Sequence, residues 1–256
     1  MTSRIIFNQE MDKLNEEVAQ MASLAREAVE KAVRCIVTMD PLLKSEVERL
    51  DQEIYHMDQI IEKRCLDVIA LHTPVAGDLR TVSTCLKVIT DLNRIGRYAS
   101  DIVEEYDVVT SQNGFPRPVN IPHMAGLVQG MVTDAIDCFV RRDDRAARML
   151  FDRDDEVDYL YELNFRAILT YMMEDPRKIT VGTHIILIAR YLERIADHSC
   201  NIGERVVYMV TGERMNPKDR KKKHDRSLAT PSFASSSVES AGHQNANRSM
   251  HELEDK

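Results

Sequence analysis

The sequence contains no tryptophan, and aromatic residues make up only 5% of its 256 residues. Glycine and proline are also scarce, with nine and eight copies, so few residues in the chain interrupt regular structure. Leucine, alanine, methionine and charged residues fill the long stretches between them, which favours helices over strands. We therefore expect an all-α protein, with enough residues for one large domain or two small ones.

No apolar run approaches the roughly 20 residues that a membrane-spanning helix needs, and no charged-then-apolar leader opens the sequence. We therefore expect a cytoplasmic protein that reaches a membrane only through its partners. The five cysteines are widely spaced and form no Cys-x-x-Cys pair, which disfavours both a disulfide scaffold and a zinc–thiolate site. Buried free thiols in a reducing compartment are expected instead.

The formal net charge of −8 is distributed unevenly along the chain. From residue 213 onward, nine Lys and Arg oppose seven Asp and Glu, which leaves 25 basic and 35 acidic residues in the remainder. An acidic body argues against nucleic acid as a direct partner and suits a cation or a basic protein surface. The segment 213–256 lacks apolar periodicity, and its basic, serine-rich composition predicts a disordered tail.

Apolar residues recur every three or four positions along six long stretches, as expected for amphipathic helices. The strongest breaker between them is segment 111–120, which contains two prolines and a glycine. It separates a first three-helix bundle, residues 1–112, from a second, residues 120–212, in which Gly212 caps the last helix. The predicted helices span residues 7–37, 41–71, 75–110, 121–141, 143–173 and 179–211.

The two halves are related by an internal repeat. At an offset of 103 residues Asp40 matches Asp143, and after the next turn the offset becomes 100, so that Arg94 matches Arg194. A difference of three residues in the length of the turn accounts for the change of offset. The sequence therefore predicts two tandem three-helix bundles with the same order of helices.

Two rows of polar side chains mark the second repeat. Asp154 and Asp158 lie four residues apart on its second helix, and Glu193, Asp197 and Asn201 follow the same spacing on its third. Residues four apart share a helix face, so like charges in such rows repel each other unless a cation intervenes. Oxygen ligands without His or Cys suit magnesium, manganese or iron. A solvated acidic face, with ion pairs to nearby arginines, is the alternative that spacing alone leaves open.

Two segments at equivalent places in the repeat carry a longer pattern. They are Tyr191-Leu-Glu-Arg-Ile-Ala-Asp-His-Ser-Cys-Asn-Ile-Gly-Glu204 and Asp91-Leu-Asn-Arg-Ile-Gly-Arg-Tyr-Ala-Ser-Asp-Ile-Val-Glu104. Both resemble a signature that the PhoU family carries twice, close to D-L-E-R-I-G-D-x-A-x-N-I-A-E. The resemblance extends over residues 7 to 212, and it implies Glu/Asp-x-x-x-Asp pairs that bind metal on the bundle surface, in some members as multinuclear iron.

The first repeat departs from this family pattern. Asn93 stands where Glu is expected, Arg97 where Asp is expected, and Tyr55 replaces the second carboxylate of the neighbouring helix. Only Asp51 and Asp101 remain, and Arg97 places a fixed positive charge where a cation would sit, four residues before Asp101. We therefore expect one metal site, formed by the carboxylates of the second bundle, and a metal-free first bundle.

The resemblance also implies a function. It implies a non-enzymatic negative regulator of phosphate uptake and phosphate-starvation signalling, which links the ATPase subunit of the phosphate ABC transporter to its sensor histidine kinase. A homodimer is left open. The alternatives are a carboxylate-rich helical metal-binding adaptor and a di-metal enzyme, neither connected with phosphate signalling. Di-metal bundles typically use two Glu-x-x-His motifs, whereas this chain has one, from Glu53 to His56, and His198 points about 100° away from the acidic row.

Overall fold

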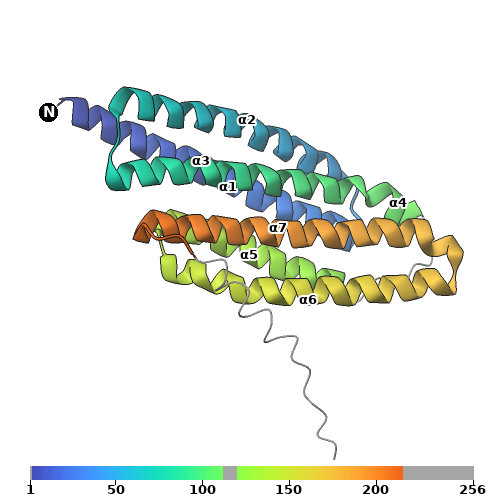
Figure 1. Ribbon diagram of the computed structural model, residues 1–256. Helices are drawn as coiled ribbons and strands as arrows, with labels where there is room; N and C mark the ends of the chain where they lie inside the picture. The colour runs from blue at the N-terminus through green and yellow to red at the C-terminus, as the bar shows by residue number, and fades with distance from the viewer. Residues whose placement is uncertain (1, 112–119, 216–256) are drawn as a thin grey trace, which may run out of the picture.

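The computed structural model describes residues 2–111 and 120–215, and all regular structure in this part of the chain is helical. The first repeat comprises α1 (Thr2–Thr38), α2 (Leu42–His72) and α3 (Ala76–Glu104), followed by the short α4 (Tyr106–Ser111). The second comprises α5 (Ile121–Arg141), α6 (Asp144–Glu174) and α7 (Ile179–Thr211), with the 3₁₀ turn η1 (Pro176–Lys178) before α7. The predicted all-α fold of two tandem three-helix bundles is confirmed (Figure 1). No helix in the described ranges is long and apolar enough to cross a bilayer.

The predicted helix over residues 75–110 is wrong in one respect, because it consists of two helices. The Glu105 N–H bonds the Ile102 carbonyl at 3.3 Å, an i→i−3 contact that tightens and ends α3. Tyr106 then donates its hydroxyl to the Met39 carbonyl at 3.0 Å, which fixes the start of α4 against the first turn of the bundle. Helix α1 also begins earlier than predicted. The predicted linker at 112–119 and most of the predicted tail, 216–256, lie outside the described residues.

The turn between the first two helices has the same geometry in both repeats. Met39 and Arg142 have φ angles of 55° and 54°, and each precedes an aspartate. The N–H groups of those aspartates bond the carbonyls of Cys35 and Cys138 at 3.3 and 3.0 Å. Each aspartate side chain also accepts the N–H of the residue two positions later, at 3.0 Å. The repeat seen in the sequence is therefore a repeat of local backbone geometry.

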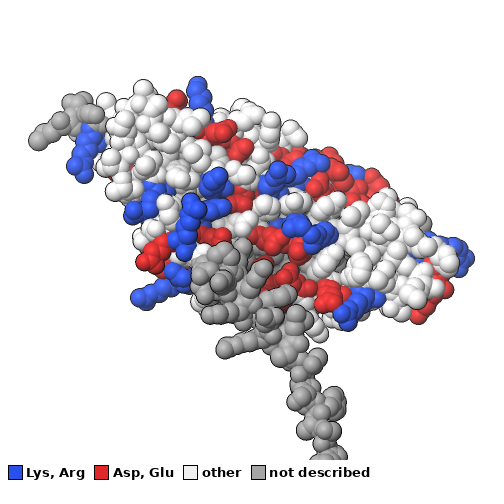
Figure 2. Space-filling model, viewed as in Figure 1, with Lys and Arg blue, Asp and Glu red and all other residues white. Residues whose placement is uncertain are grey.

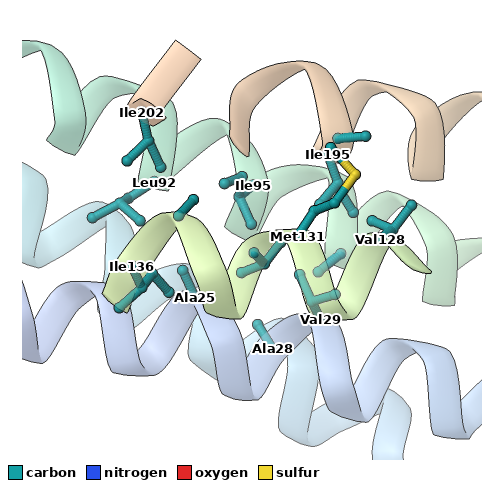
Figure 3. Packing of buried hydrophobic residues seen from close by; sticks show 14 of the residues in the cluster. Ala25, Ala28, Val29, Leu92, Ile95, Val128, Met131, Ile136, Ile195 and Ile202 are labelled. Carbon is teal, nitrogen blue, oxygen red and sulfur yellow. The ribbon is translucent and has the colours of Figure 1, made fainter. Parts of the chain in front are cut away.

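The two bundles share a central layer of four helices. α3 packs on α7 and α1 packs on α5, while α2 covers α1 and α3 on one side and α6 covers α5 and α7 on the other (Figure 1). Figure 3 shows apolar side chains from all four central helices meeting in one core: Ala25, Ala28, Val29, Leu92, Ile95, Val128, Met131, Ile136, Ile195 and Ile202. Because this core crosses the boundary between repeats, the two bundles form one packed body.

All five cysteines are buried thiols that form no disulfide, as their spacing predicted. Burial raises the pKa of Cys65 and Cys85 to about 12, so neither thiol ionises readily. Cys35 and Cys138, which are equivalent in the repeat, both have their pKa raised to about 11 by burial. These residues therefore act as small apolar groups of the core.

Candidate functional site

Each repeat presents a surface formed by its second and third helices, α2 with α3 and α6 with α7 (Figure 1). These four helices hold the residues singled out from the sequence. The first repeat carries Asp51 on α2 and Asp101 on α3. The second carries Asp154 and Asp158 on α6, and Glu193, Asp197 and Asn201 on α7.

On the second repeat, acidic and basic side chains alternate along α7. Arg190 Nη1 donates to Glu193 Oε1 at 2.9 Å, and Arg194 Nη1 donates to Asp197 Oδ2 at 3.0 Å. Arg194 Nε also lies 3.6 Å from Glu193 Oε2. The arginine ion pairs that the sequence offered as an alternative to metal are therefore present in the structure.

Glu193 is more enclosed than Asp197, with 13% of its side chain exposed against 39%. Its Oε2 atom is buried and accepts no hydrogen bond. Burial raises the pKa of Glu193, and the negative charges of Asp197 and Asp158 raise it further, whereas the two arginines lower it. A buried acceptor of this kind is stabilised by a positive group placed against it.

The side chains on this surface are of the types that bind a metal ion, but in this structure they do not lie close enough together to hold one. Asp154 and Asp158 are half-buried on α6, where each interacts with neighbouring groups. Within residues 2–111 and 120–215, no three His, Cys, Asp or Glu side chains are grouped closely enough to hold a metal. Hard oxygen donors are available on both helices, but binding requires the arginine partners of Glu193 and Asp197 to turn away.

Asn201 does not extend the acidic row, because it faces the first repeat. Its Nδ2 donates to Asp91 Oδ1 on α3 at 3.3 Å, and His198 Nδ1 lies 2.8 Å from the same oxygen. Four residues advance an α-helix by about 400°, so each step of the row turns by about 40° around α7. Two steps from Glu193 carry the row onto the side of α7 that contacts α3. The predicted direction of His198, away from Asp197, is confirmed.

On the first repeat, a guanidinium lies among the remaining acids. Arg97 Nη2 is 3.0 Å from Asp101 Oδ1 and 3.4 Å from Glu104 Oε1, and Arg97 Nη1 is 3.7 Å from Asp51 Oδ2. The predicted pairing of Arg97 with Asp101 is therefore confirmed. Burial raises the pKa of both Asp51 and Asp101, and the charge of Arg97 opposes that rise. Figure 2 shows basic and acidic side chains gathered together over the end of α3 that leads to α4.

Sequence reasoning missed the polar contacts that join the repeats. Two pairs bridge α3 and α7, Asp91 with His198 and Tyr98 with Tyr191, and a third joins Glu105, directly after α3, to His184 of α7. The tyrosine rings are stacked with centroids 6.0 Å apart. The repeat itself contained a signal, because Asp91 is equivalent to Tyr191 and Tyr98 to His198 at the offset of 100. The repeat therefore relates the first two of these pairs to each other, since it places Tyr98 and Tyr191 at the positions equivalent to His198 and Asp91.

The single Glu-x-x-His motif does not form the arrangement of a di-metal oxidase. Glu53 makes an ion pair with Arg49 on the outside of α2, and His56 is exposed. In di-metal carboxylate bundles these side chains project into the interior between the helices. The motif is therefore part of the surface of the first bundle.

Comparisons with known proteins agree with the repeat and with the fold. The model of the PhoU domain matches residues 18–106 and 121–206, one match in each repeat. Proteins described as phosphate-specific transport system accessory protein PhoU homologs, from Aquifex aeolicus and Pseudomonas aeruginosa, are each 36% identical over 80% of this chain and over 92% and 86% of their own lengths.

Two crystal structures have the same fold. PhoU from Pseudomonas aeruginosa aligns with a TM-score of 0.78 at 36% identity, covering 81% of this chain and 100% of its own. The phosphate transport system regulatory protein PhoU from Streptococcus pneumoniae aligns with a TM-score of 0.76 at 27% identity, covering 82% of this chain and 99% of its own. With both of its repeats matched and close relatives covered over most of their length, this chain belongs to the PhoU family.

Proposed function

We propose that this chain is a non-enzymatic negative regulator of phosphate uptake and of the phosphate-starvation response. The observation that carries the proposal is the match of both repeats to the PhoU domain, together with the description of its relatives as accessory proteins of phosphate-specific transport. In this role the protein acts in the cytoplasm. Its partners are the ATPase subunit of the phosphate transporter and the phosphate-sensing histidine kinase.

The unequal surfaces of the two repeats support binding to two different partners. At equivalent positions, the α2–α3 surface carries Asn93 and Arg97 where the α6–α7 surface carries Glu193 and Asp197. Charged groups at an interface select partners of complementary potential and suppress others. A body with one fold and two different surfaces suits a protein that connects a transporter with a kinase.

A metal ion on the second repeat is a further part of the proposal. Asp154, Asp158, Glu193 and Asp197 are the ligands proposed for iron, magnesium or manganese, and the buried, unbonded Glu193 Oε2 supports this assignment. Such an ion would supply positive charge that draws the carboxylates of α6 and α7 together.

Deletion of the gene in its host tests the regulatory role. Without the protein, a phosphate-starvation reporter is expected to be active in high phosphate, and expression of the full chain is expected to switch it off again. A pull-down from phosphate-replete cells, with and without residues 213–256, identifies the direct partner. An unchanged reporter in the deletion strain would defeat the proposed function.

A further inference from the structure

A groove with a volume of about 370 Å³ opens between α2 and α3 on the first repeat. Seven residues line it: Asp51, Gln52, Tyr55, Thr90, Asn93, Arg94 and Arg97. Both arginines are exposed, and so are Gln52 and Tyr55, which carry an amide and a hydroxyl donor. The groove therefore combines two fixed positive charges with neutral hydrogen-bond donors.

Its charge is opposite in sign to that of the equivalent surface on the second repeat. The seven lining positions hold two arginines and one aspartate, for a formal charge of +1. The same positions in the second repeat hold two arginines and five carboxylates, for a formal charge of −3: Asp154, Asp155, Asp158, Arg190, Glu193, Arg194 and Asp197. Equivalent positions of the same fold thus carry a net negative charge in the second repeat and a net positive charge in the first.

Because of these replacements, Arg94 has no equivalent of the ion pairs that Arg194 makes on the second repeat. On the second repeat, Arg194 is 3.0 Å from Asp197 and 3.6 Å from Glu193. On the first, those acids are replaced by Arg97 and Asn93, and no acidic side chain within the described ranges forms an ion pair with Arg94. An exposed guanidinium beside a second one is repelled by it, and a bound anion relieves that repulsion.

The negative charge of Asp51, the one acid that lines the groove, is already paired with Arg97. Asp51 is only 6% exposed and lies 3.7 Å from Arg97 Nη1, so it is recessed between the helices. The side chain of Arg97 is 51% exposed, and the other acids that it contacts, Asp101 and Glu104, do not line the groove. The surface that a ligand meets is therefore more positive than the acids around Arg97 suggest.

We propose that this groove binds a tetrahedral oxyanion of the phosphate type, held by Arg94 and Arg97 with Tyr55 and Gln52 as additional donors. Guanidinium groups present N–H donors in a planar fork that matches the oxygen spacing of such anions. Free inorganic phosphate and a phosphoryl group on a larger molecule share this chemistry. The groove is open and Arg97 is shared with three acids, so we expect a dissociation constant on the order of 1 mM. The inference does not depend on the proposed regulatory function, because the isolated protein suffices to test it.

Isothermal titration calorimetry on the full chain at constant ionic strength tests the proposal. The ligands are sodium phosphate, phenyl phosphate and sodium acetate. Arg94→Gln is the informative variant, since within the described part of the chain Arg94 makes no ion pair whose loss would destabilise the fold. It is expected to weaken phosphate binding about 10-fold or more, the effect of losing a charge-assisted contact. Arg166→Gln is the control, because it removes the same charge from a 73% exposed arginine on α6 and is expected to leave binding unchanged.

The ligands separate the two sources of the oxyanion. Saturable binding of inorganic phosphate that Arg94→Gln weakens supports a site for the free anion. Binding of phenyl phosphate alone, with the same dependence on Arg94, supports a site for a phosphoryl group on a larger molecule. The proposal is overturned if neither phosphate ligand binds saturably, if acetate binds as tightly, or if Arg94→Gln and Arg166→Gln have equal effects.

Discussion

His198 on α7 bonds Asp91 on α3, with 2.8 Å between Nδ1 and Oδ1, and so connects the second repeat to the first. Asp91 is buried, and the same oxygen accepts from Asn201 at 3.3 Å. The ring of Tyr98 lies 5.8 Å from the imidazole, centroid to centroid. The buried carboxylate of Asp91 is therefore a shared partner for two polar side chains of the second repeat.

Replacing that carboxylate is expected to destabilise the whole protein. Asp91→Ala leaves the partly buried His198 and Asn201 without their common acceptor, and an unsatisfied polar group costs about 1–3 kcal/mol. Urea unfolding monitored by circular dichroism measures the change in the free energy of unfolding. Asp137→Ala is the control, because the Asp137 side chain is 47% exposed and its ion pair within the described residues is with Arg141 on its own helix, at 3.6 Å. Its expected cost is below about 0.5 kcal/mol. Equal effects of the two substitutions would show that the contact between repeats contributes nothing.

Close helix packing gives a second prediction. A Cβ atom at Gly203 would lie 3.1 Å from the Ala147 backbone oxygen and 2.9 Å from Leu150 Cδ1, so α6 and α7 would have to separate. Gly203→Ala is expected to lower the free energy of unfolding by about 1–3 kcal/mol. Gly126→Ala is the matched control, because nothing lies within 4 Å of a Cβ there, and it is expected to stabilise the helix by about 0.5–1 kcal/mol. Thermal unfolding of both variants checks the opposite signs, and a stabilised Gly203→Ala would contradict the observed packing.

The raised pKa of Glu193 predicts a pH dependence. Burial is the largest cause, so the fold favours the protonated acid over the carboxylate. The stability that Glu193 contributes is therefore complete below its ordinary pKa of 4.5 and is lost as the pH rises through the higher folded-state value. Glu193→Gln cannot ionise, so in chelator-treated protein it is expected to match the wild type in acid and to exceed its stability near neutral pH. Urea unfolding across this range measures the difference, and a less stable variant at neutral pH would mean that the ion pairs with Arg190 and Arg194 outweigh burial.

Much of the fold follows from local sequence features. Apolar spacing located all six long helices, and Gly212 ends α7 with a φ of 76°, as a C-terminal cap requires. The pairing of Arg97 with Asp101 was also predictable, since residues four apart on a helix are neighbours whatever the rest of the chain does. Features that depend on one helix and its own residues are therefore read directly from the sequence.

The remaining features depend on contacts between distant segments. The end of α3 at Glu104 coincides with the contact between Glu105 and His184 of α7, and the anchor of α4 is the carbonyl of Met39. Asn201 was assigned to the acidic row because its spacing is correct, yet its amide donates to Asp91. Helical periodicity defines which residues share a face, but it does not say which face meets another helix.

The duplicated fold presents two different surfaces, and the central proposal is that only the second repeat binds metal. Elemental analysis of the purified full-length protein, Asp197→Ala and Asp101→Ala tests it most directly. Asp197 belongs to the acidic row of the second repeat, whereas Asp101 is paired with Arg97 in the first. We predict bound metal in the wild type and in Asp101→Ala, and its loss in Asp197→Ala. Metal content that is unchanged in Asp197→Ala, or that is lost only in Asp101→Ala, would contradict the claim.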